Sequence, residues 1–325
     1  MKREEFFQIL FRALPNYTDE DKAEVREYYE ELICDGVDAG IEEDEVIAKL
    51  EAPEKIAESL LREYAGEKKT EEQRERIADN QNMFSSKSEI HKVVIGARDR
   101  GFQIGMSDDD KVHVYCERDE MDEIVCYEND GTFYFRQNNK KKMRFFFHSV
   151  QISSTIEVKL PKSVQTLEAA TRNGGIHVKD VAISGLLKTE TTNGGIHVKD
   201  VTAGTVEMNT TNGGVHVGDV KAQNITFTTS NGGMKVADIK AEDRLAIITS
   251  NGSVQCDLIK GKIIEIRSSN AGVKGVIDGK MEDYAIQSGT SNGKNSLPNH
   301  FQMQKEKKLY VSTSNGSIKI SFSEK

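Results

Sequence analysis

The sequence has no tryptophan and only four prolines and four cysteines among its 325 residues. The cysteines show no metal-ligand spacing, which suits a reducing compartment, and they are Cys34, Cys116, Cys126 and Cys256. Cys116 and Cys126 flank a predicted turn and could face each other across a hairpin. We expect buried free thiols there rather than a disulfide.

Long apolar runs are also missing. No run reaches the roughly 18 residues that a membrane span requires. Residues 1–14 carry Lys2, Arg3, Glu4 and Glu5 and no continuous apolar core, so they do not read as a secretory signal. Unless another export route is used, we expect a cytoplasmic protein that associates with a membrane only through a partner.

Positive charge is in the minority, and the formal net charge of the chain is −9. Residues 1–79 hold 24 acidic and 12 basic side chains, a balance of −12, which leaves +3 for the rest. No basic stripe exists to neutralise phosphates, so direct binding to nucleic acid is not expected. The 26 glycines fall mostly in the second half, so composition and charge both predict a chain of two parts.

Apolar residues recur at helical spacing in residues 1–66, which predicts a compact bundle of short helices. Gly36 and Gly40 end the second helix, and Pro53 breaks the chain or starts the fourth. The predicted apolar stripes contain Phe6, Phe7, Leu10 and Leu14, then Val25, Tyr28, Tyr29, Leu32 and Ile33, then Val46, Ile47 and Leu50, then Ile56, Ala57, Leu60, Leu61 and Tyr64.

Four short motifs in this helical region occur in a fixed order. They are Phe6-Phe7-x-x-Leu10, Tyr28-Tyr29-Glu30-Glu31 with Asp35, Gly40-x-Glu42-Glu43, and Leu50-x-x-Pro53-x-x-Ile56-Ala57. Taken singly, such residues only make amphipathic helices with a solvated face. The ordered set resembles the HAAS signalling domain, an α-helical module associated with helix-turn-helix regulators. The family reads Leu-Gly-x-Pro where this chain has Leu50-Glu51-Ala52-Pro53, so the turn there differs.

The segment that follows the helices is almost entirely charged or amide-bearing, so we predict a linker over residues 67–89. Short strands are then predicted to begin and cap a β domain that fills residues 90–325. These strands are expected at 93–95, 102–104, 112–116, 124–127, 132–135 and 144–147.

A repeat with a period of 19 to 23 residues fills the rest of the chain. Each repeat is centred on an Asn-Gly-like turn, beginning at Asn173, Asn193, Asn212, Asn231, Asn251, Asn270, Asn292 and Asn315. The period is too short for a propeller blade or a helical repeat pair. It fits one coil of a parallel β-solenoid, and predicts about eight coils.

Alternation along the strands predicts which side chains point inward. Val206, Met208, Thr210 and Asn212 share one parity, so we expect the asparagine to close an inward row. Stacking would let asparagine amides hydrogen-bond from coil to coil as a structural ladder, and replacing one with leucine or alanine would then be poorly tolerated. The glycine after each asparagine is expected to supply a positive φ or a close backbone approach.

The signature Thr-Thr-Asn-Gly-Gly-x-x-Val-x-Asp-Val at residues 191–201 resembles the putative-adhesin family of repeat β-solenoids, and the resemblance extends over most of residues 90–325. This family is common in bacterial envelope-associated and stress-linked proteins. The coils after Asn270 depart from the pattern, because Ala271 replaces glycine and Lys294-Asn295 interrupts the strand after Asn292. The resemblance implies a fold and leaves function open.

Three histidines occupy one repeat position, with Lys235 next in line, and parity predicts that they project outward. The row His177, His197 and His216 could bind a transition metal or sense pH. A flat row is not the convergent cage of a zinc site, and repetition alone produces ladders of like residues. We therefore predict no metal, with these histidines as the candidates if one binds.

A second row consists of aspartates, and they are Asp180, Asp200, Asp219 and Asp238, with Asp257 in a shifted context. Stacked carboxylates could hold calcium or act as the acid/base pair of a carbohydrate-cleaving solenoid. The simpler expectation is that each aspartate caps its own turn. Equivalent coils also lack the differing environments that would separate two carboxylate pKa values.

Three functional hypotheses follow. The first is a non-enzymatic bacterial sensor or scaffold linked to envelope stress, whose helical head docks on a PadR-type regulator or an envelope-associated protein while the solenoid is a recognition surface. The second is a surface adhesin or envelope scaffold, which would require export. The third is a carbohydrate-active or metal-dependent enzyme with two carboxylates facing one cleft. No catalytic residue or cofactor is predicted, and the open end of the solenoid could support self-association.

Overall fold

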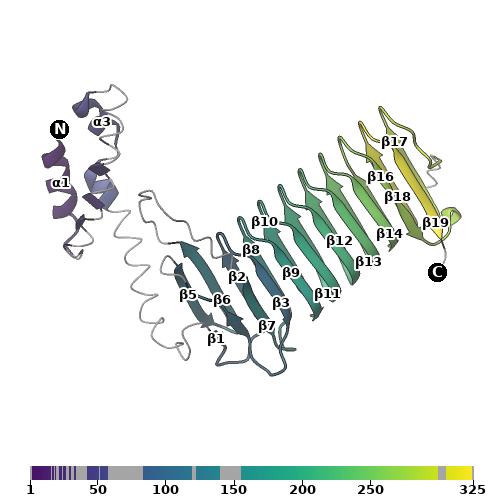
Figure 1. Cartoon of the computed structure of the whole chain (residues 1–325), viewed down its shortest axis with the longest axis horizontal. Helices are drawn as coiled ribbons and strands as arrows, with labels where there is room; N and C mark the ends of the chain where they lie inside the picture. The colour runs from purple at the N-terminus through teal and green to yellow at the C-terminus, as the bar shows by residue number, and fades with distance from the viewer. Residues whose placement is uncertain are drawn as a thin grey trace. The chain divides into compact units, whose positions relative to one another are not determined.

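The computed structural model describes residues 2–15, 17, 19, 22–23, 25–26, 29–30, 33, 42–50, 52–57, 83–118, 122–139, 155–298 and 305–323. The chain divides into two compact units, Met1–Arg76 and Ile77–Lys325. Figure 1 shows a small helical part and a large stack of strands. No helix among the described residues has both the length and the apolar character needed to cross a membrane.

The first unit contains helix α1, Arg3–Arg12, and helix α3, Glu43–Lys49, and residues 53–57 are also helical. Phe6, Phe7 and Leu10 are fully buried on one face of α1, as their spacing predicts. They share an apolar core with Ile33 and Ile47, among others. The stretch predicted as the second helix is described only in part, and Cys34 lies outside the described residues.

The second unit contains the strands that Figure 1 shows side by side. Their bounds are β1 Met83–Ser85, β2 Lys92–Ala97, β3 Phe102–Met106, β4 His113–Tyr115, β5 Asp122–Asn129, β6 Thr132–Asn139, β7 Ile156–Leu160, β8 Thr166–Thr171, β9 Ile176–Ala182, β10 Leu186–Thr191, β11 Ile196–Thr210, β12 Val215–Thr229, β13 Met234–Thr249, β14 Val254–Lys260, β15 Ile263–Arg267, β16 Val273–Asp278, β17 Tyr284–Thr290, β18 Lys307–Thr313 and β19 Ile318–Ser323. β1 lies inside the range predicted as linker, and the strand predicted at 144–147 lies outside the described residues.

Successive repeats pair side by side in parallel, giving a solenoid-like β unit. β11 pairs with β12 from Ile196↔Val215 to Thr210↔Thr229, and β12 pairs with β13 in the same way. We call each repeat a layer. Apolar side chains alternate inward along most of the strands, and those of β12 include Val215, Ile225 and Phe227, all fully buried. The inner side chains of all the layers form one continuous core.

The layers do not follow chain order at either end. β2 pairs with both β6 and β8, so it lies between them. At the other end β18 pairs with both β15 and β17, so the later strand occupies the position between two earlier ones. The antiparallel pairs β1–β4, β4–β7 and β5–β6 lie in and beside the region predicted as the β cap.

The turn residues correct one sequence expectation, because the asparagines are exposed rather than inward. β11 ends at Thr210, so alternation no longer applies two residues later at Asn212. The buried polar residue of this turn is the threonine, which is 6% exposed. Its hydroxyl donates to the carbonyl of Gly194 in the previous layer at 3.0 Å and accepts from the N–H of Gly213 in its own layer at 3.1 Å.

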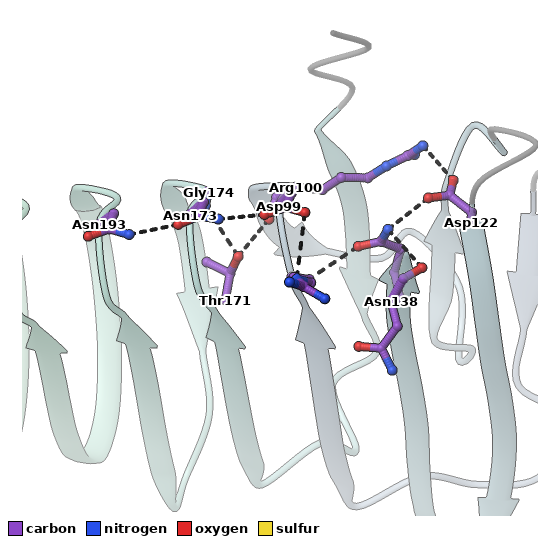
Figure 2. Close-up of polar contacts among 10 residues, drawn as sticks. Asp99, Arg100, Asp122, Asn138, Thr171, Asn173, Gly174 and Asn193 are labelled. Atoms are coloured by element: carbon purple, nitrogen blue, oxygen red, sulfur yellow. Dashed lines mark hydrogen bonds and ion pairs between the residues drawn. The ribbon is translucent and has the colours of Figure 1, made fainter. Parts of the chain in front are cut away.

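The asparagine amides nevertheless form a chain of hydrogen bonds. Each Nδ2 donates to the Oδ1 of the neighbouring layer at 2.7 to 2.9 Å, as between Asn193 and Asn173 (Figure 2). Asn315 donates to Asn270, and Asn292 donates to Asn315, because the layer of β18 lies between those of β15 and β17. This series of hydrogen bonds ends on a carboxylate, which can only accept. Each asparagine in the series must therefore donate through Nδ2 toward that carboxylate and accept through Oδ1 from the other side.

That carboxylate belongs to Asp99, which accepts from Asn173 at 2.5 Å (Figure 2). Beyond it, the buried Arg100 forms an ion pair with Asp122, and Gln137 donates to the same aspartate at 2.7 Å. A buried charge pair needs such added hydrogen bonds to offset desolvation. This network closes the turn side of the stack at its N-terminal end.

The glycine after each asparagine serves close approach rather than a positive φ. A Cβ at Gly213 would lie 1.8 Å from the carbonyl oxygen of Gly194. Positive φ falls instead on the aspartate row, for example 55° at Asp200, where β11 bends. Ala271, which stands in the glycine position, keeps the same turn, since its N–H donates to Ser268 at 3.2 Å.

The cysteines in the described residues are free and buried, as expected. Desolvation raises the pKa of Cys116 to about 11 and that of Cys126 and Cys256 to about 12. These thiols are therefore poor nucleophiles.

Candidate functional site

The histidine row lies on one outward face of the β unit. His177 on β9, His197 on β11 and His216 on β12 are register partners, and Lys235 on β13 continues the row. All four side chains are exposed, as parity predicts. The ring centroids are 4.7 Å apart in the first pair and 4.8 Å in the second. The row thus advances by one layer spacing per side chain.

A second outward row runs beside the first, two residues further along each strand. It contains Lys179, Lys199, Gly218, Ala237 and Asp257 in register. We call the six basic or imidazole side chains of the two rows the cationic track, and they are His177, His197, His216, Lys235, Lys179 and Lys199. Next to Gly218 and Ala237, the cationic track borders a hollow of about 610 Å³.

The charges of the cationic track are only weakly compensated. Lys179 lies 3.4 Å from Asp180 and Lys199 lies 4.0 Å from Asp200, and exposed pairs of this kind contribute little. Within the described part of the chain, the three histidines and Lys235 have no hydrogen bond or ion pair. Desolvation, then the charges of its two neighbours in the row, lower the pKa of His197 from its usual 6.5.

The ring geometry bears on metal binding. The planes of His177 and His197 are within 4° of parallel. An imidazole lone pair lies in its ring plane, so two parallel rings 4.7 Å apart do not direct lone pairs at one ion 2.0–2.1 Å away. Among the described residues, no group of three or more histidine, cysteine or acidic side chains is arranged to hold a metal.

The aspartate row occupies the bend of each layer. Asp180, Asp219 and Asp238 have φ between 52° and 54°, which explains aspartate there, because it tolerates the left-handed region better than most residues. In the next layer Leu258 takes this conformation at 50°, and Asp257 stands one residue earlier. The shifted context of Asp257 is thus a one-residue displacement from the bend.

A second hollow, of about 710 Å³, was not predicted from the sequence. Its floor includes the register partners Ala203, Ala222 and Ala241, and its rim includes Lys221 and Lys240. These lysines share one repeat position, and comparing equivalent positions of the repeats, as for the histidines, would have revealed them. Other rim lysines are paired, such as Lys260 with Asp278 at 3.2 Å and Lys262 with Asp243 at 3.2 Å.

A Ser–His–Asp cluster in the β cap was also missed. Ser85 Oγ lies 2.7 Å from His113 Nδ1, and His113 Nε2 lies 2.9 Å from both carboxylate oxygens of Asp109. The backbone N–H of Lys111 and the hydroxyl of Ser107 also donate to Asp109, and these bonds with His113 lower its pKa to about 2. Neither hollow described above is lined by this cluster, and its hydrogen bonds join β1 to β4 and to the loop before β4.

Comparisons with known proteins give two family matches. A model described as Toastrack DUF4097 matches residues 90–325, and a model described as HAAS matches residues 5–59. No curated protein matches the chain. A solved structure titled a putative adhesin, from Bacteroides fragilis NCTC 9343, is similar with 10% identity and a TM-score of 0.36, covering 74% of this chain and 98% of its own. A second, titled a putative cell adhesion protein, from Clostridium sporogenes ATCC 15579, has 9% identity and a TM-score of 0.23, covering 74% and 99%.

Proposed function

Since this chain belongs to the Toastrack DUF4097 family and its N-terminal residues match the HAAS model, we propose that it is a non-enzymatic protein-interaction protein that acts as a sensor or scaffold. The helical unit docks on a protein partner, either a PadR-type regulator or an envelope-associated protein. The β unit is the recognition surface. Its proposed setting is the cytoplasm, with contact to a membrane only through the partner and a role in envelope stress.

The observation that carries this proposal is the shared register of outward side chains on the face that carries the histidine row. From β9 to β13, equivalent positions of successive strands lie side by side, so one face offers a straight and regular surface. We treat the layers as about eight coils of one parallel β-solenoid, and such stacks use extended surfaces for binding. The side chains of the cationic track are exposed and little used by the fold itself.

The docking role of the helical unit has a direct test on the full chain. A PadR-type regulator encoded beside the gene would be purified, and its affinity for the chain measured by titration calorimetry. Asp44 and Glu45 are exposed on α3, so the double variant Asp44→Lys/Glu45→Lys should weaken binding at least about tenfold if the acidic helical unit is the contact.

The matched control removes charge from the other unit. Lys221→Gln/Lys240→Gln alters the rim of the second hollow and should leave regulator affinity unchanged. If the chain binds neither the regulator nor any membrane protein encoded beside it, the docking proposal fails. Cell fractionation would separate this proposal from a surface adhesin or envelope scaffold, since those must be recovered outside the cytoplasm.

A further inference from the structure

The cationic track is linear, and this limits what it can bind. Its side chains advance one layer at a time, at 4.7 and 4.8 Å between ring centroids, and do not converge on a point. A compact anion would touch only one or two of them. A rod-like partner with anionic groups at regular intervals would touch them all.

The chemistry of the track selects an acceptor. Lysine and protonated histidine are donors with no acceptor, so the matching groups are carboxylates or phosphates. The charged groups near the histidines are Lys179 and Asp180 on β9, Lys199 and Asp200 on β11, Asp219 on β12, Lys235 and Asp238 on β13, and Asp257 on β14. Four of these aspartates lie at the bend rather than in either row of the track. Asp257 follows Ala237 in the second row and lines the hollow, so the cationic side chains of that row are confined to the layers of β9 and β11.

The hollow beside the track has room because two small residues line it. A Cβ added at Gly218 would meet no atom within 4 Å, and this glycine does not have a positive φ. Its lack of a side chain is therefore not required for packing, unlike that of Gly213. The preceding layers carry Lys179 and Lys199 at this position, so the glycine opens space that a lysine would occupy.

Spacing favours one kind of rod. In an α-helix, side chains at i, i+3 or i+4, and i+7 share a face and advance about 5.3 Å per step, close to the layer spacing. In an extended peptide, side chains on one face advance about 6.6 Å per step and lose register within two layers. Single-stranded nucleic acid is recognised by aromatic stacking, and the residues lining this hollow include no phenylalanine, tyrosine or tryptophan.

We propose that the cationic track is a docking site for an acidic helix of a protein partner, with one carboxylate over each of three successive layers. The helix lies along the stacking direction, with its flank in the hollow over Gly218. Carboxylates at i, i+3 or i+4, and i+7 pair with three successive side chains of the row from His177 to Lys235. This inference deepens the proposed function, because it gives the β unit a partner of defined chemistry.

The test uses the full-length chain and two synthetic helical peptides of identical composition. One peptide places glutamates at i, i+4 and i+7, and the other distributes them around the helix. Fluorescence anisotropy at low salt should show the aligned peptide binding at least about tenfold more tightly than the distributed one. Binding should strengthen from pH 7.5 to pH 5.5, because imidazole gains charge over this range while glutamate stays ionised.

Variants locate the site. Gly218→Glu places a negative charge at the hollow, and its Cβ would meet no atom within 4 Å, so it should abolish the preference for the aligned peptide while leaving the melting temperature unchanged. His197→Gln/His216→Gln should remove most of the pH dependence. Lys221→Gln/Lys240→Gln, on the second hollow, should bind as the wild type does.

Three results would overturn the inference. Equal affinity for both peptides would show that the helical spacing of the glutamates does not matter. Wild-type affinity in Gly218→Glu would show that the peptide binds elsewhere. Tighter binding of polyphosphate or single-stranded DNA than of the aligned peptide would identify a different class of partner. Regulator binding would be measured on the same preparations. If the regulator binds and the aligned peptide does not, this inference fails while the docking role of the helical unit stands.

Discussion

The threonine and the asparagine of each turn should differ in their contribution to stability, and one layer allows a matched comparison. In β12, Thr229 is 2% exposed, whereas Asn231 at the following turn is exposed. Thr229→Val keeps the shape and removes the hydroxyl. Asn231→Ala removes the amide that links this layer to its neighbours on both sides.

The expected magnitudes follow from what each change leaves behind. The Thr229 hydroxyl donates to the carbonyl of Gly213 at 3.0 Å and accepts from the N–H of Gly232 at 3.1 Å. Valine leaves two partly buried backbone groups without partners, at about 1–3 kcal/mol each, so we expect a total loss of about 2–6 kcal/mol. Asn231 makes amide hydrogen bonds of 2.7 and 2.8 Å, but water replaces exposed bonds, so Asn231→Ala should cost about 1 kcal/mol.

Urea unfolding followed by circular dichroism would give both values, provided that the slope with denaturant is unchanged. Native-state hydrogen exchange would add local resolution, because stacked repeats can open layer by layer. Thr229→Val should weaken protection on both sides of its layer. If Asn231→Ala proves as costly as Thr229→Val, then the amide chain rather than the buried hydroxyl holds the turns, and our reasoning from burial is wrong.

Four further outcomes are expected. Leu258→Asn should stabilise the chain by about 1 kcal/mol in thermal unfolding, since leucine there has a φ of 50°, and a loss of stability would contradict this. Gly213→Ala should prevent layer stacking and lower the melting temperature sharply, whereas Gly218→Ala should not change it. Because burial and neighbouring imidazoles lower the pKa of His197, its contribution to stability is complete above pH 6.5 and is lost as pH falls through the lower folded value, so His197→Gln should flatten that part of the pH profile. Cys256, whose pKa burial raises to about 12, should resist thiol reagents at pH 8 until the chain unfolds.

The repeat and the inward apolar rows were predictable from sequence because strand alternation has a strict period of two. That period holds only within a strand, which is why the inward prediction was wrong for Asn212, two residues past the end of β11. The outward histidines were predictable for the same reason, since they lie inside strands. The hollow at Gly218 could not be predicted, because a single glycine in one repeat does not indicate open space until the neighbouring layers are known.

The order of the layers could not be predicted, because repetition makes every layer an acceptable neighbour for every other. The sequence steps lengthen to 22 and 23 residues after Asn270, and it is there that the chain skips a position and returns to fill it. A longer step indicates an irregularity without indicating its direction. At the other end, the placement of β2 between β6 and β8 has no comparable signal in the spacing.

The inserted position of β18 has a consequence for how the molecule is made. A ribosome releases β17 before β18, so the emerging chain must hold a place open beside β15 or build it provisionally and rearrange. Synthesis from one end to the other cannot simply deposit one layer upon the last. Completion of this part of the stack therefore waits for β18, which joins β17 to the layers already formed.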